Sequence, residues 1–293
     1  MSGITWNAEK ACAGALDDIL KLGLLHEANV ELGFPPETAL RKRIATPVEI
    51  MNFPLVVERI KKIVKQVKQV TAHLAMIDIA SLDEAVRRRN VATQIEVMKI
   101  AYSLGIERFI LHPADGETKY PWFASRAKKE QVIRRRQAAS AKSVHEIVDA
   151  LSGYPIVIGI ENMDIDDGNW AIKKLGYGFG QHDKLFLGVC LDTLHEFSNG
   201  CRTPEQFVDL INACEDFLVE VHLNNGFGRK KRLGRTIAHR HQALTVGSVP
   251  VKEIICRLLK DGFSRPVVVE VDSSGEVDIS IEHIWRAPHL LFL

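Results

Sequence analysis

The sequence predicts an α/β protein in which eight strand–helix units close into one (β/α)8 barrel, a single domain over residues 1–293. Strand and helix patterns alternate along the chain, which is typical of a parallel sheet. The strand-like segments are apolar and rich in β-branched residues, as expected of strands buried on both faces. The length of 293 residues also suits one such barrel, which takes about 250.

Eight segments are predicted to form the strands. Each contains a short apolar run, and helical stretches separate most of them. The segments are GITWN (3–7), ANVELGF (28–34), VTAHL (70–74), RFILHPA (108–114), IVIGIEN (156–162), LFLGVCLDTLH (185–195), FLVEVHLNN (217–225) and VVVEV (267–271). An open doubly wound sheet is the alternative, but its glycine-rich phosphate fingerprint is missing after the first segment.

Helices are expected between these strands, where apolar residues recur at helical spacing. They cover residues 8–24, 53–68, 83–104, 124–151, 203–214 and 250–261. Gly105 is predicted to cap the third helix, because many helices end in a left-handed glycine. The fourth carries a basic cluster from Arg126 to Arg136. A solvated outer face is the simplest interpretation of this cluster, and contact with a polyanion is the alternative.

The composition, with 46% hydrophobic and 26% charged residues, is that of a globular protein with a large core. The net charge of +1 and the pI of about 7.7 give no overall basic excess that would indicate nucleic-acid binding. The five cysteines are odd in number and form no CxxC pair, which favours reduced thiols and a cytoplasmic protein. Neither a secretion signal nor a run of about 18 apolar residues is found, so no membrane partner is expected.

Residues of metal-binding types stand at the C-terminal ends of the predicted strands. They are histidines and acids that recur from strand to strand: His73, His112, Glu161, Asp192, His195, His222, His241 and Glu270. In a parallel barrel, these strand ends meet on one face. Imidazole and carboxylate suit zinc, manganese or iron. A single histidine beside an apolar run is usually a packed or surface residue, but the repetition predicts a metal site.

Two short spacings support this site. Asp192 and His195 form D-x-x-H just beyond a strand, so both can face one cavity from adjacent positions of a turn. His239 and His241 form H-x-H, which places both side chains on the same side of an extended segment. The first spacing is moderately specific for a shared site, and the second alone is weak.

Two glutamates stand on strands that would lie roughly opposite each other in a barrel. Glu161 and Glu270 could bridge metal ions, or they could act as a general acid and a general base. For either glutamate alone, a buried salt bridge to lysine or arginine is the alternative interpretation. The complete series of ligand types favours the metal site.

Two further features could contribute to substrate binding. The motif GRKKRLGR (228–235) lies between the seventh predicted strand and the H-x-H segment, on the loop side of the barrel, where it could contact phosphates of a sugar phosphate or a nucleic acid. A solvated lysine-rich loop is the alternative. Trp6 and Trp122 could wall a sugar-binding cavity, although packing in the core or at the rim is the more common role of tryptophan.

Over essentially its whole length, and most specifically from His73 to Glu270, the chain resembles the superfamily of xylose-isomerase-like TIM barrels. The closest stretches are GVCLDTLHEFSNG and VEVHLNN. This superfamily includes endonuclease IV and many isomerases and epimerases of sugars or sugar phosphates. The resemblance implies that four residues bind one divalent metal ion, as in the sugar-enzyme branch: Glu161, Asp192, His222 and Glu270. These four indicate the superfamily without choosing a branch.

The endonuclease IV branch holds three zinc ions, and the resemblance implies five additional ligands: His73, His112, His195, His239 and His241. The nuclease has aspartate at position 239, so His239 alters the charge of a third metal position, although imidazole can still ligate zinc. Other departures weigh against DNA repair. NMDIDDGNW after Glu161 is not the glycine-rich stretch of the nuclease, and LAMIDIAS after His73 offers no aromatic wedge for nucleotide flipping.

Two enzyme functions follow, and both need divalent metal, Zn²⁺ or Mn²⁺, with one to three ions per chain. The leading hypothesis is an isomerase or epimerase of a small carbohydrate. Metal would stabilise an enediolate, Glu161 and Glu270 would move the proton, and His195 would orient the substrate. The alternative is zinc-dependent phosphoester hydrolysis, which better explains His73, His112 and His241. Nucleic acid is a less favoured partner, and a noncatalytic binding module or a homo-oligomer also stays open.

Overall fold

The structure, a computed structural model, describes residues 29–34, 46–114, 125–163, 176–232, 235–239, 242–260 and 262–270. The chain divides into two compact units. Unit 1 comprises Met1–Ile160 and Lys174–Gly188, and unit 2 comprises Glu161–Lys173 and Val189–Leu293. The strand expected at 3–7 and the helix expected at 8–24 lie outside the described residues, as do Trp6 and Trp122. A single domain over residues 1–293 stays a prediction.

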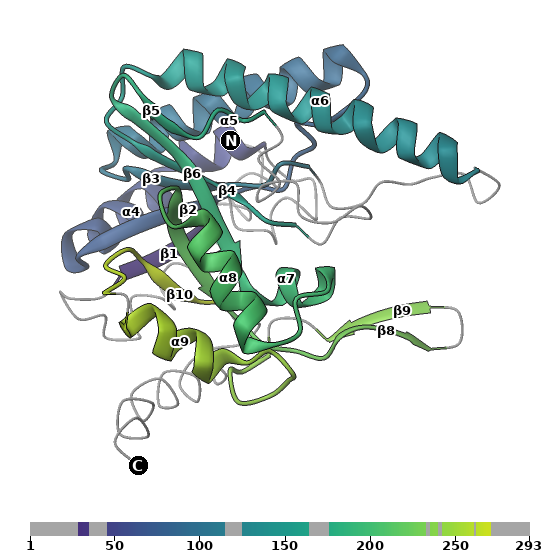
Figure 1. The fold of residues 1–293 in the computed structure, drawn as a ribbon. Coiled ribbons are helices and arrows are strands. Elements are labelled where there is room, and N and C mark those ends of the chain that lie inside the picture. The colour runs from purple at the N-terminus through teal and green to yellow at the C-terminus, as the bar shows by residue number, and fades with distance from the viewer. Residues whose placement is uncertain are drawn as a thin grey trace. The chain divides into compact units, whose positions relative to one another are not determined.

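Unit 1 contains a parallel sheet whose strands follow the order of the chain (Figure 1). These strands are β1 (Asn29–Phe34), β2 (Gln69–Leu74), β3 (Arg108–Leu111) and β4 (Val157–Glu161), the last ending in the first residue of unit 2. β6 (Leu185–Asp192) begins beside β4, where Phe186 N donates to Ile156 O over 2.9 Å. β5 (Gly180–His182) pairs antiparallel with this part of β6. The strands predicted within 28–34, 70–74, 108–114 and 156–162 are confirmed.

The helices of unit 1 begin and end where side chains satisfy their backbone groups. They are α3 (Pro47–Met51), α4 (Pro54–Gln66), α5 (Glu84–Ser103) and α6 (Arg126–Leu151). Asp83 caps α5 by accepting from Ala85 N and Val86 N, and Ser125 caps α6 by accepting from Lys128 N. Gly105 follows the end of α5 with φ +96°, which confirms its predicted place at the helix terminus.

A buried arginine joins α5 to α6, which lie side by side (Figure 1). Arg87 is 1% exposed, and its guanidinium donates to Glu84, Ser143 and Glu146 over 2.7–3.0 Å. All three acceptors are needed because an arginine buried without partners would be costly. The network fixes the crossing of the two longest described helices.

The basic cluster on α6 is only partly a solvated face. Arg126 is exposed and pairs with Glu130 on the same helix over 2.8 Å. Arg136 is buried instead, and both of its terminal nitrogens donate to Asp78 over 3.0 and 3.1 Å. The solvated interpretation is therefore wrong for Arg136, which a carboxylate holds against the loop after β2.

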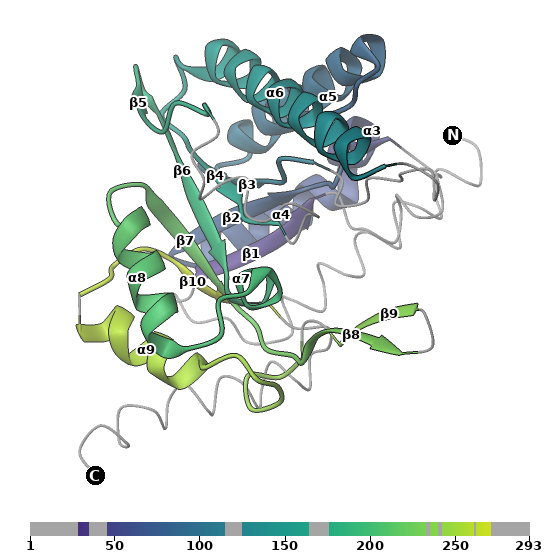
Figure 2. The same cartoon turned by 45° about the vertical axis from the view of Figure 1, so that its right-hand side comes forward.

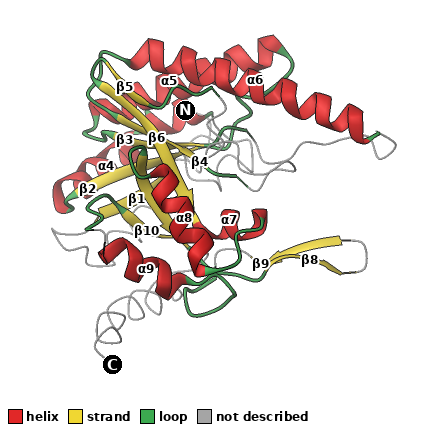
Figure 3. Ribbon diagram, in the orientation of Figure 1, coloured by secondary structure: helices red, strands yellow, loops and turns green. Residues whose placement is uncertain are grey.

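Unit 2 contains the end of β6 and two further parallel strands (Figure 3). These are β7 (Leu218–Leu223) and β10 (Val267–Val269). Its helices are α7 (Thr193–Asn199), α8 (Pro204–Cys214) and α9 (Val251–Lys260). The strand predicted within 185–195, with its end at Asp192, is confirmed, and the side chain of Asp192 caps α7. The helices predicted over 203–214 and 250–261 are confirmed.

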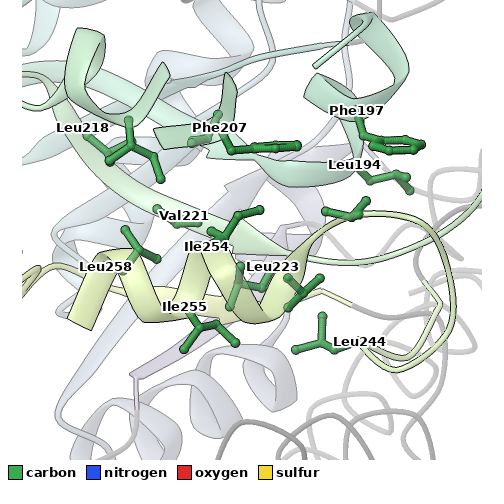
Figure 4. Close-up of a cluster of buried hydrophobic side chains, with 14 of the residues drawn as sticks. Leu194, Phe197, Phe207, Leu218, Val221, Leu223, Leu244, Ile254, Ile255 and Leu258 are labelled. Atoms are coloured by element: carbon green, nitrogen blue, oxygen red, sulfur yellow. The ribbon is translucent and has the colours of Figure 1, made fainter. Parts of the chain in front are cut away.

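The two faces of β7 have different roles because side chains alternate along a strand. Val221 and Leu223 belong to a buried apolar cluster with Phe207 of α8 and with Ile254 and Leu258 of α9 (Figure 4). Burial of each such side chain contributes roughly 1.5–3 kcal/mol. This packing holds the outer face of β7, so that the polar residues of its other face are fixed in position.

The segment expected to be a basic loop forms a β-hairpin in unit 2. β8 (Gly228–Arg232) pairs antiparallel with β9 (Arg235–His239), and the two strands extend away from the neighbouring α7 (Figures 1 and 2). Two residues separate the strands in the sequence, the spacing of a tight hairpin. The alternative of a lysine-rich loop is therefore wrong for 228–232, and contact of this segment with phosphates stays a prediction. Among the helices in the described ranges, none is long and apolar enough to cross a membrane.

Candidate metal centre

Three ligand-type residues of unit 2 form a compact buried group. Glu161 ends β4, Asp192 ends β6 and His222 lies on β7, and their potential ligand atoms are all within 4.8 Å of one another. Asp192 and His222 are direct partners in the parallel pairing of β6 and β7, which places them side by side. All three side chains are buried. The three strand ends thus meet as the sequence predicted.

Asp192 is held at both carboxylate oxygens. Its Oδ1 accepts the backbone N–H of His195 over 2.6 Å as the N-cap of α7, and its Oδ2 accepts the side-chain amide of Asn224 over 2.5 Å. D-x-x-H therefore spans the start of a helix rather than the predicted turn. The cap fixes the carboxylate at the helix N-terminus, where negative charge is favoured.

His195 lies against the same group. Its Nδ1 is 3.0 Å from Glu161 Oε1, 3.7 Å from Asp192 Oδ1 and 2.9 Å from the backbone oxygen of Asn162. A proton on Nδ1 satisfies the carbonyl and leaves the lone pair of Nε2 for a ligand or a substrate. His195 can therefore act either as a metal ligand or as a group that orients substrate.

Glu270 approaches the group from the end of β10. Its Oε2 lies 3.2 Å from His222 Nδ1 and 3.4 Å from Asn224 Nδ2. Its side chain is 30% exposed, whereas Glu161 is buried. Of the two glutamates predicted as acid and base, Glu270 is thus the one with access to solvent.

The charges of this group fit a divalent cation. Burial raises the pKa of the Asp192 carboxyl; the charge of His195 opposes this shift, and the carboxylates of Glu270 and Glu161 reinforce it. Several carboxylates held together in a buried place are costly without a compensating positive charge. Carboxylate and imidazole are also the ligand types that zinc and manganese accept. These donors therefore suit the metal that was predicted.

Two buried asparagines that the sequence analysis missed support the ligands. Asn162 Oδ1 accepts Asp192 N over 2.5 Å, and its Nδ2 donates to Asp192 O over 3.0 Å and to Glu196 Oε2 over 3.2 Å. Asn224 donates to Asp192 and lies near Glu270, as described above. Both stand within two positions of a predicted ligand, in ENM and HLNN. That proximity was the available signal, but neutral amides do not stand out in a search for ionisable residues.

Unit 1 holds a second group of ligand types. The rings of His73 and His112 meet edge to face with centroids 4.7 Å apart. Glu31, on β1, has a carboxylate oxygen within 4.8 Å of a ring nitrogen of His73. Glu31 was not predicted, although it belongs to the predicted strand 28–34. The role of His73 and His112 as metal ligands stays a prediction.

Comparison with protein families tests the resemblance to xylose-isomerase-like barrels that the residues at the strand ends suggested. A profile described as "Xylose isomerase-like TIM barrel" matches residues 30–288. The chain belongs to this family. Its predicted fold, a xylose isomerase-like TIM barrel of the α/β class, is confirmed.

Solved structures with the xylose isomerase-like fold include enzymes of two kinds. A D-tagatose 3-epimerase-like protein matches with a TM-score of 0.67 and 17% identity, over 89% of this chain and 88% of its own. Endonuclease IV from Thermus thermophilus matches with a TM-score of 0.60 and 17% identity, over 89% and 98%. D-allulose 3-epimerase from Methylomonas sp. matches with a TM-score of 0.55 and 19% identity, over 96% and 84%. At these identities the likeness concerns the fold.

The remaining predicted ligands of this xylose isomerase-like barrel are the H-x-H pair. The backbone of His239 ends β9 opposite Gly228, so this residue does stand on an extended segment. Its side chain and the whole of His241 lie outside what the structure describes. Their predicted role as ligands stays a prediction.

Proposed function

We propose that this protein is a divalent-metal-dependent isomerase or epimerase of a small polyhydroxylated substrate, a sugar or a sugar phosphate. The observation that carries the proposal is the buried group of Glu161, Asp192 and His222, with Glu270 at 3.2 Å from His222 Nδ1. The likeness to a D-tagatose 3-epimerase-like protein and to a D-allulose 3-epimerase supports the choice of substrate class. Enzymatic activity itself is part of the proposal.

The four residues Glu161, Asp192, His222 and Glu270 would hold the ion. When bound, Zn²⁺ or Mn²⁺ would supply a Lewis acid that stabilises negative charge developing on substrate oxygens. The buried asparagines beside the ligands would keep them oriented before substrate arrives. A single ion of this kind is sufficient for isomerase chemistry.

The proton would be moved by the two glutamates. Glu270 is the partly exposed carboxylate, so it would take the proton from the carbon next to the substrate carbonyl. In an epimerisation, Glu161 would deliver a proton to the opposite face of the same carbon. In an isomerisation, Glu270 would return the proton to the former carbonyl carbon, while the hydroxyl proton of the neighbouring carbon passes to the former carbonyl oxygen. No net oxidation occurs because the electron pair of the broken C–H bond stays in the substrate and each proton that is removed is replaced. His195 Nε2 would bind a substrate hydroxyl and fix the sugar between the carboxylates.

A second function, metal-dependent phosphoester hydrolysis, is favoured by one specific observation. His73 and His112 lie in ring contact, and a mononuclear isomerase does not require this pair. Additional metal ions would generate hydroxide and clamp the attacking and leaving oxygens of a phosphodiester. The likeness to endonuclease IV supports this alternative.

Exchange of substrate protons with solvent distinguishes an isomerase or epimerase from a phosphoester hydrolase. Metal-loaded protein is incubated in D₂O with a panel of ketohexoses and sugar phosphates, and deuterium incorporation is followed by proton NMR. Parallel reactions contain bis(p-nitrophenyl) phosphate and abasic DNA. Deuterium at the carbon beside the carbonyl, lost in Glu270→Gln, would support the isomerase. Hydrolysis of the phosphodiesters without exchange would contradict the isomerase and support the alternative.

A further inference from the structure

The β8–β9 hairpin concentrates positive charge that the proposed metal-dependent reaction does not use. Six lysine and arginine residues and no acidic residue lie between Asn225 and Gln242, although the net charge of the whole chain is only +1. The remainder of the chain is therefore net negative. We propose that this hairpin binds duplex DNA by entering the major groove and contacting the phosphates on both sides. The inference goes beyond the proposed function and does not rest on it.

The base of the hairpin is fixed to the end of β7. Asn225 and Gln242 form a β-bridge, in which Gln242 N donates to Asn225 O over 3.1 Å. The side chain of Asn225 donates to Leu244 O over 2.8 Å and accepts Val249 N over 2.9 Å. A Cβ atom at Gly247 would overlap Asn225 Oδ1, so the loop after the hairpin packs closely against its base. This anchoring supports a two-stranded ribbon, which alone would be marginally stable.

The shape of the hairpin suits the major groove of B-DNA. β8 and β9 form a two-stranded sheet of their own, and both views show it extending away from α7 of the same unit (Figures 1 and 2). A sheet with its side chains is about 10 Å thick, whereas the major groove is about 12 Å wide and the minor groove about 6 Å. The hairpin can therefore enter the major groove tip first, with one face toward each phosphate backbone. β-Ribbons enter DNA grooves in several classes of DNA-binding protein.

The pairing register places cations on both faces of the ribbon. Successive residues of a strand belong to opposite faces, so Lys230 and Arg232 belong to one face. Arg229 and Lys231 belong to the other. Arg235 of β9 pairs with Arg232 and shares its face. Cations on two faces cannot converge on a single phosphate group, and they cannot all meet a planar anionic membrane. They suit a groove with a phosphate backbone on each side.

The tip of the hairpin carries two arginines in directly opposed positions. Arg232 and Arg235 are cross-strand partners, and like charges at such positions destabilise a pair of strands. Lysine on an edge strand can prevent pairing with other chains, but that purpose does not require two opposed arginines. Phosphates beside them would neutralise the repulsion, and arginine can bind a phosphate through two parallel hydrogen bonds. The arginine pair is therefore unfavourable in the hairpin alone and favourable in a complex with DNA.

Binding of this kind needs no base flipping. The lack of an aromatic wedge in LAMIDIAS weighs against nucleotide flipping, but phosphate contacts require no wedge and carry no sequence information. We therefore expect binding that has little sequence preference and that weakens steeply as salt is added. The major groove of duplex RNA is deep and narrow, so DNA should be preferred over RNA of the same length.

Fluorescence anisotropy with a labelled duplex of about 20 base pairs tests the proposal on the full chain. Wild type should bind with a dissociation constant of about 10⁻⁶ to 10⁻⁴ M at physiological salt. A quadruple variant should bind at least about tenfold more weakly, and its log K should fall less steeply with log salt, because each lost phosphate contact removes about 0.9 from the slope. Its substitutions are Arg229→Gln, Lys230→Gln, Lys231→Gln and Arg232→Gln. Wild type that binds no DNA would overturn the proposal.

A second quadruple variant is the matched control, because it changes the net charge by the same amount. It alters four exposed lysines in and just after α4. We expect its affinity and its salt dependence to equal those of wild type. An equal loss of affinity in the two quadruple variants would show that the overall charge, and not the hairpin, binds the DNA. The control substitutions are Lys61→Gln, Lys62→Gln, Lys65→Gln and Lys68→Gln.

Two double variants test whether both faces take part. Lys230→Gln with Arg232→Gln neutralises one face, and Arg229→Gln with Lys231→Gln neutralises the other. Both should weaken DNA binding and reduce the salt dependence, and circular dichroism checks their folding. Weakened binding in only one of them would contradict insertion into a groove, even if the quadruple variant failed to fold. Absence of DNA binding would leave the proposed metal centre intact, and absence of metal would leave the DNA-binding proposal intact.

Discussion

The side-chain amide of Asn224 donates to Asp192 Oδ2 over 2.5 Å and lies 3.4 Å from Glu270 Oε2. The oxygen of the Asn224 side chain accepts Leu194 N over 3.1 Å, and its backbone N–H donates to Thr193 Oγ1 over 3.2 Å. One asparagine thus ties the end of β7 to the first turn of α7 and to two carboxylates. Ligands held in this way need little rearrangement to receive an ion.

Replacement of Asn224 should therefore affect both binding and stability. Asn224→Ala leaves Asp192 Oδ2 and Leu194 N without these partners in a buried place, so we expect a stability loss of about 1–3 kcal/mol and a metal affinity at least about tenfold lower. Urea unfolding and titration calorimetry measure the two effects. Asn212→Ala, which removes an exposed bond to Arg257, is the control and should change neither. An unchanged metal affinity in Asn224→Ala would show that the asparagine does not orient the ligands.

The pH dependence of the metal-free protein tests the charge of Asp192. Burial raises the pKa of this carboxyl above its unfolded value. Its contribution to stability is therefore fully present below the unfolded pKa, about 3.9, and is lost as the pH rises through the folded pKa. Asp192→Asn keeps the helix cap, because asparagine also caps helices well, but it has no charge that titrates. The variant should therefore lose less stability than wild type as the pH rises from about 4 to about 7. Melting temperatures in the presence of a chelator measure this, and parallel curves for the two proteins would exclude the effect.

His112 distinguishes a mononuclear from a multinuclear centre. His112→Ala removes one of the two rings in contact in unit 1 but none of the four ligands proposed for the single ion. Under the isomerase proposal, we expect metal content to be unchanged and turnover to be retained in part. Metal analysis and steady-state kinetics on the same preparation distinguish a mononuclear from a multinuclear centre. Total loss of turnover together with loss of bound metal would favour the hydrolase.

Arg87 should be a major source of stability in unit 1. Arg87→Ala removes the side chain that joins Glu84 to Glu146 and Ser143. The two carboxylates are 47% and 38% exposed, and Ser143 Oγ still donates to Ile79 O, so we expect a loss of about 1–3 kcal/mol. The adjacent Arg88 is 70% exposed and pairs with the same Glu84, so Arg88→Ala should cost less than about 1 kcal/mol. Urea denaturation compares the two variants. Equal losses of stability in the two variants would show that burial of Arg87 does not increase its contribution to stability.

The strand ends could be predicted because each combines an apolar β-branched run with one ligand-type residue. Other features leave no such pattern. Helix α7 is short, and its cap Asp192 is also a candidate ligand, so the sequence pattern predicts a turn after Asp192 rather than a helix. The β8–β9 hairpin is too basic to resemble a strand. Arg136 pairs with Asp78, which lies 58 positions away in the sequence. No local sequence pattern can indicate such a contact.

The four cysteines in the described ranges are free thiols: Cys190, Cys201, Cys214 and Cys256. This agrees with the reduced thiols that the sequence predicts. Cytoplasmic location and homo-oligomerisation stay predictions.

The most direct test of the proposed metal centre is the divalent metal content of the purified chain, compared with that of His222→Ala. The protein is prepared without chelator, exposed to excess Zn²⁺ or Mn²⁺, desalted and analysed by mass spectrometry of the elements, with circular dichroism as the check of folding. We predict at least one ion per wild-type chain and its loss in folded His222→Ala, since this imidazole lies among the three carboxylates. Absence of metal from wild type, or the same content in the two proteins, would contradict a centre built on His222.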